Sequence, residues 1–514
     1  MTDPPQLIQS LQDPSIYPHS VDSFHLIETH ISWVLLTGDY AYKIKKSVKY
    51  DFVDFSSLSR RKRYCKKELE LNRRLSPEIY EAVIKITGTP ENPTLDGDQQ
   101  AIEYAVKMEQ FNQEDLFSAR SERDELSRET IDKLAQTVSD FHAGIQDSPP
   151  SSDYASPDLI KENVEENFEE IELDHFDGDT RQSLEWIRSW SRDRFDDLSS
   201  LMQARRRNGA VRNCHGDMHL KNIAEHNDEI NIFDCIEFNE SFRWIDVIDE
   251  IAFLTMDLVD RGHPELANRF IDRYLMYSDQ YDGLPLLDFY RCYRAMVRCK
   301  VSYLQADPPA EDGTLPDEFY DYLETAKFFT ETPDPLLMIT HGLSGSGKTT
   351  VTQEILETIG AIRLRSDVER KRLAGLDYTE EAGEELYSEQ VTRKTYELLR
   401  NKGETVLRAG LPLIVDATFL KHEFRKQFRG LAEKLEVPFR ILSVECDVST
   451  LRDRLKQRQS EEATVSDAGT DVLDYQLETR DSLEPAEEVD SLKIKTDGDG
   501  LTSDHITLIK SLTE

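Results

Sequence analysis

One segment of the chain has the residue types and the spacing of a phosphate-binding loop. Residues 342–349 read GLSGSGKT and match the pattern G-x-x-x-x-G-K-[ST]. Glycine tolerates the backbone angles that turn N–H groups inward, where they face phosphate oxygens. In such a loop Lys348 reaches the β- and γ-phosphates, and the hydroxyl of Thr349 binds Mg²⁺. The predicted nucleotide-binding residues are Gly342, Leu343, Ser344, Gly345, Ser346, Gly347, Lys348, Thr349 and Thr350.

Charged side chains that follow this loop have the types that phosphoryl transfer requires. Asp367, in RSDVERKRLAG, is placed to accept the proton of an attacking hydroxyl, and Arg370, one turn later, to hold the acceptor. Asp416 ends the apolar run LPLIVD, a position suited to a magnesium ligand. Arg454 and Arg458 are four residues apart and share a helix face, from which they would close over the transferring phosphoryl group.

The base of the nucleotide is predicted to be adenine. Residues 401–404 read NKGE and so lack the Asp of the guanine signature N-K-x-D. This favours ATP over GTP, and the predicted cofactors are ATP and Mg²⁺.

A second group of polar residues lies at 215–222, which read HGDMHLKN. Kinases use a loop Asp to accept the proton of the acceptor, and a later Asn and a second Asp to bind Mg²⁺. Here the apolar run INIFD follows the loop and ends at Asp234. The spacing predicts Asp217 as the base, and Asn222 and Asp234 as magnesium ligands. An ordinary polar loop is the alternative interpretation.

The partners of this second group on the ATP side are expected upstream. Lys43 and Lys45 are two residues apart in AYKIKKSVK, so on a strand both point to the same face. One of them would contact phosphates and pair with Glu68 or Glu70 on the following helix. We favour Lys45 with Glu68; the other pairings and a solvated basic strand edge stay open. The G-x-G-x-x-G loop of protein kinases is missing from this part of the sequence.

The segments around the second group predict a small sheet with one helix, followed by a helical region. Residues 24–55 alternate in strand fashion around the turn TGDY and suggest two paired strands, and residues 57–75 have helical spacing. Short strand signals follow at 82–87 and 101–107, with the turn-rich GTPENPTLDGD between them. Helical spacing begins at about 127 and, after the loop SPPSSDYASPD at 148–158, continues to about 206.

Apolar runs alternate with helical patterns in the last third of the chain, which is typical of parallel βαβ units. The acidic, proline-containing segment ADPPAEDGTLPDE before them is predicted to be a linker. The expected strands are 335–342, 361–367, 411–419 and 439–447.

Composition limits the class of protein. The 514 residues carry 62 Lys and Arg against 100 Asp and Glu, a net charge of −38, which argues against a protein that coats polymeric nucleic acid. Six scattered cysteines without a CxxC pair predict reduced thiols in the cytoplasm. No apolar run approaches the roughly 18 residues of a membrane helix, and the first residues lack the pattern of a secretory signal.

Residues 335–514 resemble the small P-loop kinases that include gluconate kinase, zeta toxin and polynucleotide kinase. The resemblance rests on GLSGSGKTT, RSDVERKRLAG, VDATF, LRDRLKQR and SDAGTDVLDYQ. It implies that Asp367 is the base, that Arg370 binds the acceptor, and that Arg454 and Arg458 belong to a lid. The segment SEEATVSDAG would be the tail of that lid.

Residues 20–305 resemble the aminoglycoside phosphotransferase family, which shares the protein-kinase-like fold with choline and fructosamine kinases. The matching pieces are TGDYAYKIKKSV, KKELELNRRL, LAQTVSDFHAGI, HGDMHLKN and INIFDCIEF. The order of the halves is similar to that of bacterial bifunctional aminoglycoside phosphotransferase/ATP-binding proteins. The resemblance implies an α+β kinase-like domain at 1–305 with an antiparallel-sheet lobe and a helical lobe, a linker at 306–334, and an α/β P-loop domain with a parallel sheet at 335–514.

These patterns favour an ATP- and Mg²⁺-dependent phosphotransferase with two nucleotide sites that acts on hydroxyl groups of small molecules. Nothing in the sequence indicates an aminocyclitol site, a membrane partner or an obligate protein partner, and polymeric nucleic acid ranks below sugars and small metabolites as acceptor. Two alternatives stay open. One is an active P-loop half regulated by a ligand-binding kinase-like half, and the other is a nucleotide-gated ATPase that signals through a partner.

Overall fold

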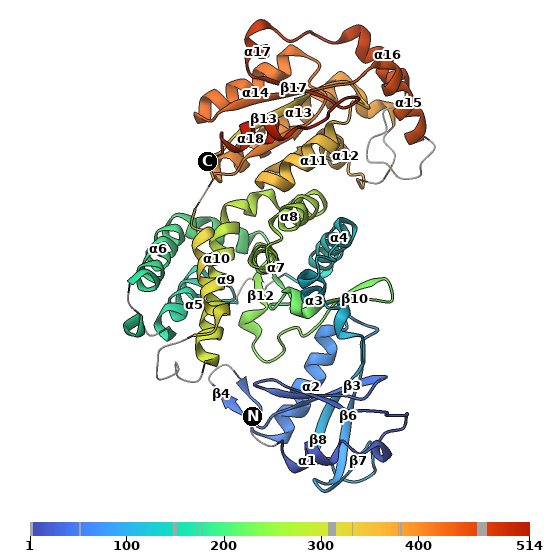
Figure 1. The fold of residues 1–514 in the computed structure, drawn as a ribbon, viewed down its shortest axis with the longest axis vertical. Helices are drawn as coiled ribbons and strands as arrows, with labels where there is room; N and C mark the ends of the chain where they lie inside the picture. Colours follow the sequence, from blue (N-terminus) through green and yellow to red (C-terminus); the bar gives the residue numbers. More distant parts are fainter. Residues whose placement is uncertain are drawn as a thin grey trace. The chain divides into compact units, whose positions relative to one another are not determined.

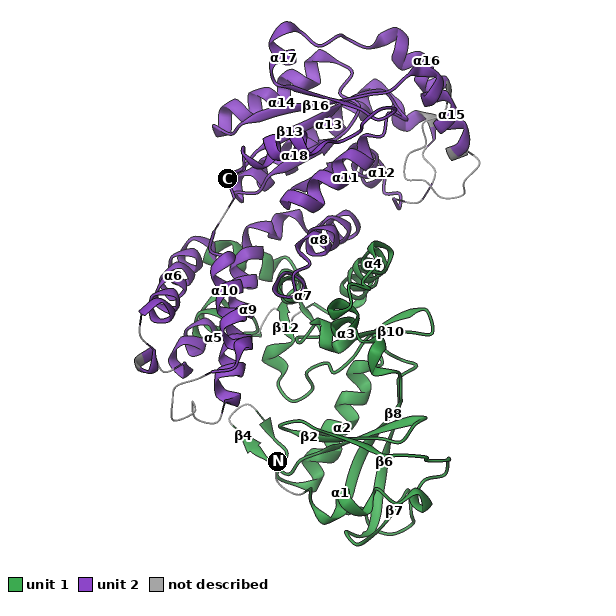
Figure 2. Ribbon diagram, viewed as in Figure 1, with its two compact units in different colours: residues 1–163, 199–257 green, residues 164–198, 258–514 purple. Residues whose placement is uncertain are grey.

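The computed structural model describes residues 4–50, 53–147, 152–171, 173–176, 178–306, 315–331, 333–378, 380, 383–459 and 470–513. The chain divides into two compact units, which Figure 2 shows in different colours. Unit 1 comprises residues 1–163 and 199–257, and unit 2 comprises residues 164–198 and 258–514. This division follows contacts in space, and the domain boundaries expected from the sequence remain a prediction.

A six-stranded antiparallel sheet forms the first part of unit 1 (Figure 1), with the order β1-β2-β3-β8-β6-β7. The turn TGDY joins β2 to β3, as expected, and β1 adds a third strand to the two that the alternation suggested. The strands are β1 (His25–Glu28), β2 (Ser32–Leu36), β3 (Tyr40–Lys45), β6 (Tyr80–Thr89), β7 (Asn92–Leu95) and β8 (Glu103–Glu109), and the short pair β4 (Lys49–Tyr50) and β5 (Val53–Asp54) lies apart from them.

The turn-rich segment between the expected strands 82–87 and 101–107 contains the strand β7, which the sequence pattern did not predict. Strand β7 forms a hairpin with β6, and Thr89 faces Asn92 across its end. Pro93 lies within β7 at the edge of the sheet. A proline is tolerated there because an edge strand has only one neighbour to pair with. The composition of a turn therefore concealed an edge strand.

Helix α2 (Leu58–Asn72) packs against β6 and β8 and matches the helix expected at 57–75. The side chain of Ser57 accepts a hydrogen bond from the N–H of Arg60 and so caps its first turn. Its buried positions include Cys65, Leu71 and also the charged Glu68. A buried carboxylate requires partners, and these come from β3.

Two short strand pairs hold the polar loops of unit 1. Strand β9 (Val211–Asn213) pairs with β12 (Trp244–Asp246), and β10 (Ile223–His226) pairs with β11 (Glu229–Ile232). Asp217 follows β9, and Asp234 follows β11.

The first seven helices among the described residues include α2, described above. The others are α1 (Gln6–Ser10), α3 (Phe117–Glu122), α4 (Arg128–Gly144), α5 (Pro157–Glu170), α6 (Gly178–Arg207) and α7 (Val247–Asp260).

Unit 2 contains a five-stranded parallel sheet of order β14-β15-β13-β16-β17. The four strands expected from the apolar runs are β13 (Leu337–His341), β14 (Ile362–Arg365), β15 (Leu413–Asp416) and β16 (Phe439–Glu445). The fifth strand, β17 (Ser491–Lys495), was not predicted from the sequence. Met338, Ile414 and Leu442 lie at the centre of the core of the sheet. The helices around it are α11 (Lys348–Ile359), α12 (Ser366–Leu373), α13 (Glu389–Arg408), α14 (His422–Leu435), α15 (Val448–Gln459), α16 (Thr470–Thr479), α17 (Pro485–Val489) and α18 (Ser503–Lys510).

The helices that precede this sheet in the chain also belong to unit 2. They are α8 (Pro264–Ser278), α9 (Leu287–Gln305) and α10 (Asp317–Phe328). Helix α10 packs on α9, so part of the segment expected as a linker is helical. Helix α8 contacts α11 and β14 (Figure 1), which brings it against the P-loop part of the unit.

The expected fold class is confirmed, with a kinase-like arrangement around an antiparallel sheet and a P-loop arrangement around a parallel one.

All six cysteines are free thiols that form no disulfide. Burial raises the pKa of the Cys65 thiol and of the Cys292 thiol to about 12. Among the described residues, we find no helix with the length and apolar character needed to cross a bilayer.

Candidate active sites

The phosphate-binding loop lies between β13 and α11. Gly347 precedes the first residue of α11 and has φ of 89°, in the left-handed region that favours glycine. A Cβ atom at Gly342 would lie 2.4 Å from the carbonyl oxygen of Val444. The helix begins at Lys348, so the N–H groups of its first turn are directed at the loop. The loop therefore has the strand–loop–helix setting that suits phosphate binding.

The two predicted magnesium ligands of this loop are in contact. The hydroxyl of Thr349 donates a hydrogen bond to Oδ2 of Asp416 at 2.9 Å, and Asp416 is buried at the end of β15. The Nζ of Lys348 donates to the carbonyl oxygen of Leu343, 2.8 Å away within the same loop. A hydroxyl and a carboxylate are oxygen ligands of the kind that Mg²⁺ prefers. Their roles as ligands stay predictions.

The predicted base and acceptor ligand lie together on α12. Nη1 of Arg370 is 3.5 Å from Oδ1 of Asp367, one turn earlier in the helix. The Arg370 guanidinium is buried, and it lies over the ring of Tyr387 with 4.7 Å to the ring centre. Asp367 is partly exposed, and Arg365 at the end of β14 lies 3.9 Å from Asp416. Asp367 thus follows β14, and Asp416 ends the adjacent parallel strand β15.

Arg454 is bound to the phosphate-binding loop. Its guanidinium donates to the carbonyl oxygen of Gly345 at 3.4 Å and to both the hydroxyl and the carbonyl oxygen of Thr496 at 3.0 Å. Arg454 therefore lies beside the loop in this conformation. The side chain of Arg458 and the segment SEEATVSDAG lie outside the described residues.

Two further residues support the loop, and the sequence reading did not assign them. Thr496, just after β17, donates from its hydroxyl to the carbonyl oxygen of Ser346 at 2.8 Å. Gln476 on α16 accepts from the N–H of Ser344 and donates to its hydroxyl, each at 2.9 Å. Gln476 ends the segment SDAGTDVLDYQ, whose resemblance to P-loop kinases was the signal for it, whereas Thr496 lies in no recognised motif.

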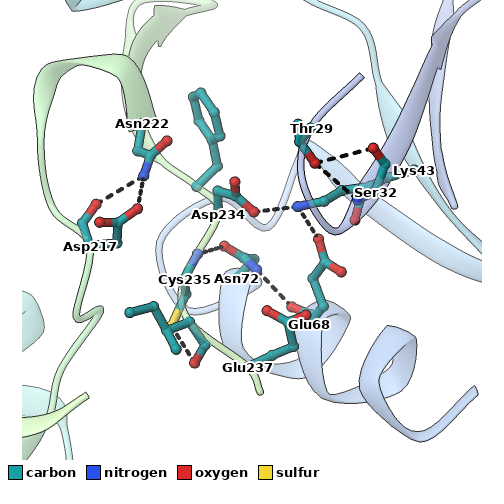
Figure 3. Close-up of polar contacts among 12 residues, drawn as sticks. Thr29, Ser32, Lys43, Glu68, Asn72, Asp217, Asn222, Asp234, Cys235 and Glu237 are labelled. Atoms are coloured by element: carbon teal, nitrogen blue, oxygen red, sulfur yellow. Dashed lines mark hydrogen bonds and ion pairs between the residues drawn. The ribbon is translucent and has the colours of Figure 1, made fainter. Parts of the chain in front are cut away.

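In unit 1, Lys43 and Lys45 both pair with Glu68; Figure 3 shows the contact of Lys43. Nζ of Lys43 lies 2.9 Å from one carboxylate oxygen of Glu68, and Nζ of Lys45 lies 2.6 Å from the other. Lys43 also contacts Asp234, and Lys45 contacts Glu237. Burial opposes the charged form of Glu68, but the two lysine charges outweigh it and lower the pKa of Glu68 to about 2.

These contacts identify which of the two candidate glutamates pairs with the strand lysines. Glu70 is exposed and pairs with Lys67 at 3.2 Å, so Glu68 is the glutamate that faces the sheet. Lys43 is the lysine that reaches a predicted magnesium ligand, Asp234, whereas Lys45 pairs with two buried carboxylates. The favoured pair of Lys45 with Glu68 is therefore present, Lys43 shares the same carboxylate, and the lysine that contacts phosphates stays a prediction.

A cavity of about 160 Å³ lies next to Lys43 and Asp234. It has a largely apolar lining with a few polar groups, which is common in pockets for small molecules. Lys43 and Asp234 form one part of its wall. The other lining residues include Ile27, Val34, Leu36, Ala41, Ile79, Tyr80, Met108, Phe111, Leu116 and Phe233.

The predicted base of unit 1 is oriented by the predicted metal ligand Asn222. The amide Nδ2 of Asn222 donates to both Oδ2 and the carbonyl oxygen of Asp217, each at 2.9 Å (Figure 3). Asp234 has φ of 64°, a left-handed conformation, and its carboxylate points at Lys43. The structure therefore brings Asp217 and Asn222 together, and Asp234 together with Lys43 and Glu68.

Glu250 on α7 holds the backbone of this loop, a role that the sequence reading did not assign. Its carboxylate accepts from the N–H of His215 at 2.8 Å and of Gly216 at 2.7 Å. The ring of His142 on α4 contacts it at 3.0 Å. Burial raises the pKa of Glu250, but the hydrogen bond and charge of His142, with the charge of His215 and the Gly216 N–H, outweigh burial and lower it to about 2.

Comparison with known proteins bears on both units. Residues 337–483 match the family model described as an AAA domain. This segment is a P-loop domain. The match includes the phosphate-binding loop, Asp367, Asp416 and Arg454, and it ends before Thr496.

The chain is similar to the uncharacterized protein Rv2004c of Mycobacterium tuberculosis, with 27% identity over 446 residues that cover 84% of this chain and 85% of the relative. The ethanolamine kinase of Plasmodium vivax covers 61% of this chain and 84% of its own, at 13% identity and a TM-score of 0.39. A gluconokinase of Sinorhizobium meliloti covers 35% of this chain and 91% of its own, at 19% identity and a TM-score of 0.24.

Proposed function

We propose that this chain is an ATP- and Mg²⁺-dependent phosphotransferase with two nucleotide sites, one in each unit, that acts on hydroxyl groups of small molecules. The contact between Thr349 and Asp416 carries the proposal, because it joins the end of the phosphate-binding loop to a buried carboxylate at a strand end. A plain glycine-rich turn needs no such carboxylate beside it.

In unit 2, the reaction would proceed between the phosphate-binding loop and α12. The loop N–H groups and Lys348 would hold the phosphates, and Arg370 would hold the acceptor. The acceptor oxygen would form a bond to the γ-phosphorus as the bond from that phosphorus to the bridging oxygen of ADP breaks. The proton of the hydroxyl would pass to the carboxylate of Asp367. Arg454, already beside the loop, would stabilise charge on the transferring group.

In unit 1, Asp217 would accept the proton in the equivalent step. The hydrogen bond from Asn222 supports this role because it fixes the carboxylate in one orientation. Lys43 would contact phosphates while Glu68 holds it in place, and the apolar cavity beside Lys43 would receive the adenine. Glu250 would hold the backbone of the loop in place through the N–H groups of His215 and Gly216.

The residues of both sites fit Mg²⁺, since each offers carboxylate and other oxygen ligands close to a lysine for phosphate. Thr349 and Asp416 would hold the ion in unit 2, and Asn222 and Asp234 in unit 1. A bound Mg²⁺ would neutralise phosphate charge during transfer.

The net charge of −38 supports small acceptors over polymeric nucleic acid. The six free cysteines support a reducing compartment, the cytoplasm. No observation on the described residues calls for an obligate protein partner.

The proposal is tested by following label from γ-labelled ATP into a mixture of small metabolites with the full-length chain. Products that vanish with Lys348→Ala belong to the unit 2 site, and products that vanish with Asp217→Ala belong to the unit 1 site. Lys394→Ala, an exposed change on α13, is the matched control and should leave all products unchanged. Consumption of ATP by the parent without any labelled product would favour the nucleotide-gated ATPase instead.

A further inference from the structure

Helix α8 lies along the helix that follows the phosphate-binding loop (Figure 1). Nδ2 of Asn268 on α8 donates to the carbonyl oxygen of Glu357 on α11 at 3.0 Å. Next to it, Arg269 forms an ion pair with the Glu357 carboxylate at 2.7 Å, with both side chains largely buried. Residues that precede the AAA-domain match by more than 60 positions therefore form part of the wall around α11.

One turn further along α8, Asp272 forms a buried two-point ion pair with Arg363 of β14. Nε of Arg363 lies 3.2 Å from Oδ1 of Asp272, and Nη2 lies 2.7 Å from Oδ2. Both side chains are almost fully buried. This parallel geometry is the most directional that an arginine and a carboxylate can form.

The same guanidinium also binds the first turn of α11. Nη1 of Arg363 donates to the carbonyl oxygen of Thr349 and to the hydroxyl of Thr352, each at 3.1 Å, and Nη2 donates to Gln353 at 2.7 Å. Thr349 is the residue whose hydroxyl contacts Asp416. Arg363 therefore links Asp272 to Thr349, the predicted magnesium ligand, through the backbone carbonyl of Thr349.

We propose that Asp272 is a positioning residue for the P-loop site, a role that rests on the proposed function of that site. Its carboxylate fixes the plane of the Arg363 guanidinium, which in turn fixes the carbonyl of Thr349 and with it the direction of the hydroxyl. Without the carboxylate, the buried guanidinium would keep its charge and lose the two-point contact with Asp272, so it would turn toward other acceptors. The P-loop site is then complete only with α8 in place.

The test uses hydrogen–deuterium exchange of the full-length chain, read on peptides that span residues 342–353, as MgATP is titrated. Exchange on these peptides reports the P-loop site by itself, whatever happens at the site in unit 1. We expect Asp272→Asn to raise the MgATP concentration for half-protection by about tenfold, as the loss of a supporting partner behind a metal ligand typically does. Asp272→Glu, which keeps the charge, should restore most of the affinity.

Arg269→Gln is the matched control, because it removes the neighbouring buried ion pair between α8 and α11 without touching Arg363. We expect it to lower the thermal midpoint of the chain while the half-protection concentration stays within about twofold of the parent. If Asp272→Asn fails to fold, Arg363→Lys takes its place, since lysine keeps the charge but cannot bind both Asp272 and Thr349 in one plane.

A folded Asp272→Asn or Arg363→Lys chain with the half-protection concentration of the parent would overturn the inference. An equal rise with Arg269→Gln would also overturn it, because the effect would then be one of general packing. Absence of MgATP protection in the parent would overturn the proposed function of the loop, a result that is distinct from the other two.

Discussion

Lys43 and Glu68 form a buried ion pair, with Nζ 2.9 Å from Oε1, and Lys43 at the same time contacts Asp234. The second carboxylate oxygen of Glu68 forms an ion pair with Nζ of Lys45. One carboxylate thus holds two lysines that differ in their other partner, and this difference separates their expected roles.

Lys43→Met should lower phosphoryl transfer at the unit 1 site by about 100-fold, because the phosphates lose a positioned charge. It should cost less stability than Lys45→Met, because the second partner of Lys43, Asp234, is partly exposed. Lys45→Met should lower the free energy of unfolding by about 3 kcal/mol, because Glu68 and Glu237 would then face each other in the interior with one lysine fewer. Transfer of label from γ-labelled ATP and unfolding by urea, each measured on the two variants, check these two predictions. A stable, inactive Lys45→Met together with an active Lys43→Met would return the assignment to Lys45.

Acid should destabilise the chain partly through Glu250. Its folded pKa of about 2 lies below the ordinary value of 4.5, so its contribution is complete above 4.5 and is lost as the pH falls from there toward 2. The contribution at neutral pH is about 3 kcal/mol. Glu250→Gln should therefore flatten the dependence of the urea midpoint on pH between about 5 and 3, whereas the exposed Glu78→Gln should keep the parent slope. Parallel pH curves for Glu250→Gln and the parent would contradict this.

Gly347→Ala should abolish nucleotide binding at the P-loop site. Gly347 has φ of 89°, and its Cβ would lie 3.2 Å from the side chain of Thr496, so the loop must change shape. Gly430→Ala is the matched control, because Gly430 lies inside α14 with open space at its Cβ. That change should stabilise the chain by about 0.5–1 kcal/mol and leave binding intact. Protection of peptides spanning residues 342–353 against hydrogen–deuterium exchange, measured as MgATP is titrated, checks both variants at this site alone. Equal affinity in the two variants would refute the expectation.

Thr496→Val should weaken transfer at the P-loop site, because it removes the hydroxyl that binds both Ser346 and Arg454. Valine keeps the shape of threonine, so a loss of about tenfold in kcat/KM with an unchanged thermal midpoint is expected. Thr502→Val in the same C-terminal region removes only a helix cap and should lower the thermal midpoint without this loss. The prediction fails if the two variants have the same kcat/KM.

The residues that a short motif or a strand end determines could be predicted from the sequence. Lys348 and Thr349 follow from the spacing of one loop, and Asp416 follows from its position at the end of an apolar run. The choice between Lys43 and Lys45 could not be made, because both point to one face of β3 and the decision depends on Asp234 and Glu237, about 190 residues away.

Residues that act across long sequence separations were missed for the same reason. Thr496 lies 150 positions after Ser346, and Asp272 lies 91 positions before Arg363. Neither belongs to a periodic pattern or a motif, so only the packed structure reveals the contact. Strand β7 was missed for a different reason, since an edge strand tolerates the composition of a turn.

The central claim is that the loop at 342–349 binds the triphosphate of ATP, with Lys348 at the phosphates and Mg²⁺ beside Thr349 and Asp416. A crystal structure of the full-length chain with a non-hydrolysable ATP analogue and Mg²⁺ tests it most directly. The account predicts phosphate density within the loop and an ion bound to the Thr349 hydroxyl. A loop that remains empty when the analogue is present at saturating concentration would contradict it.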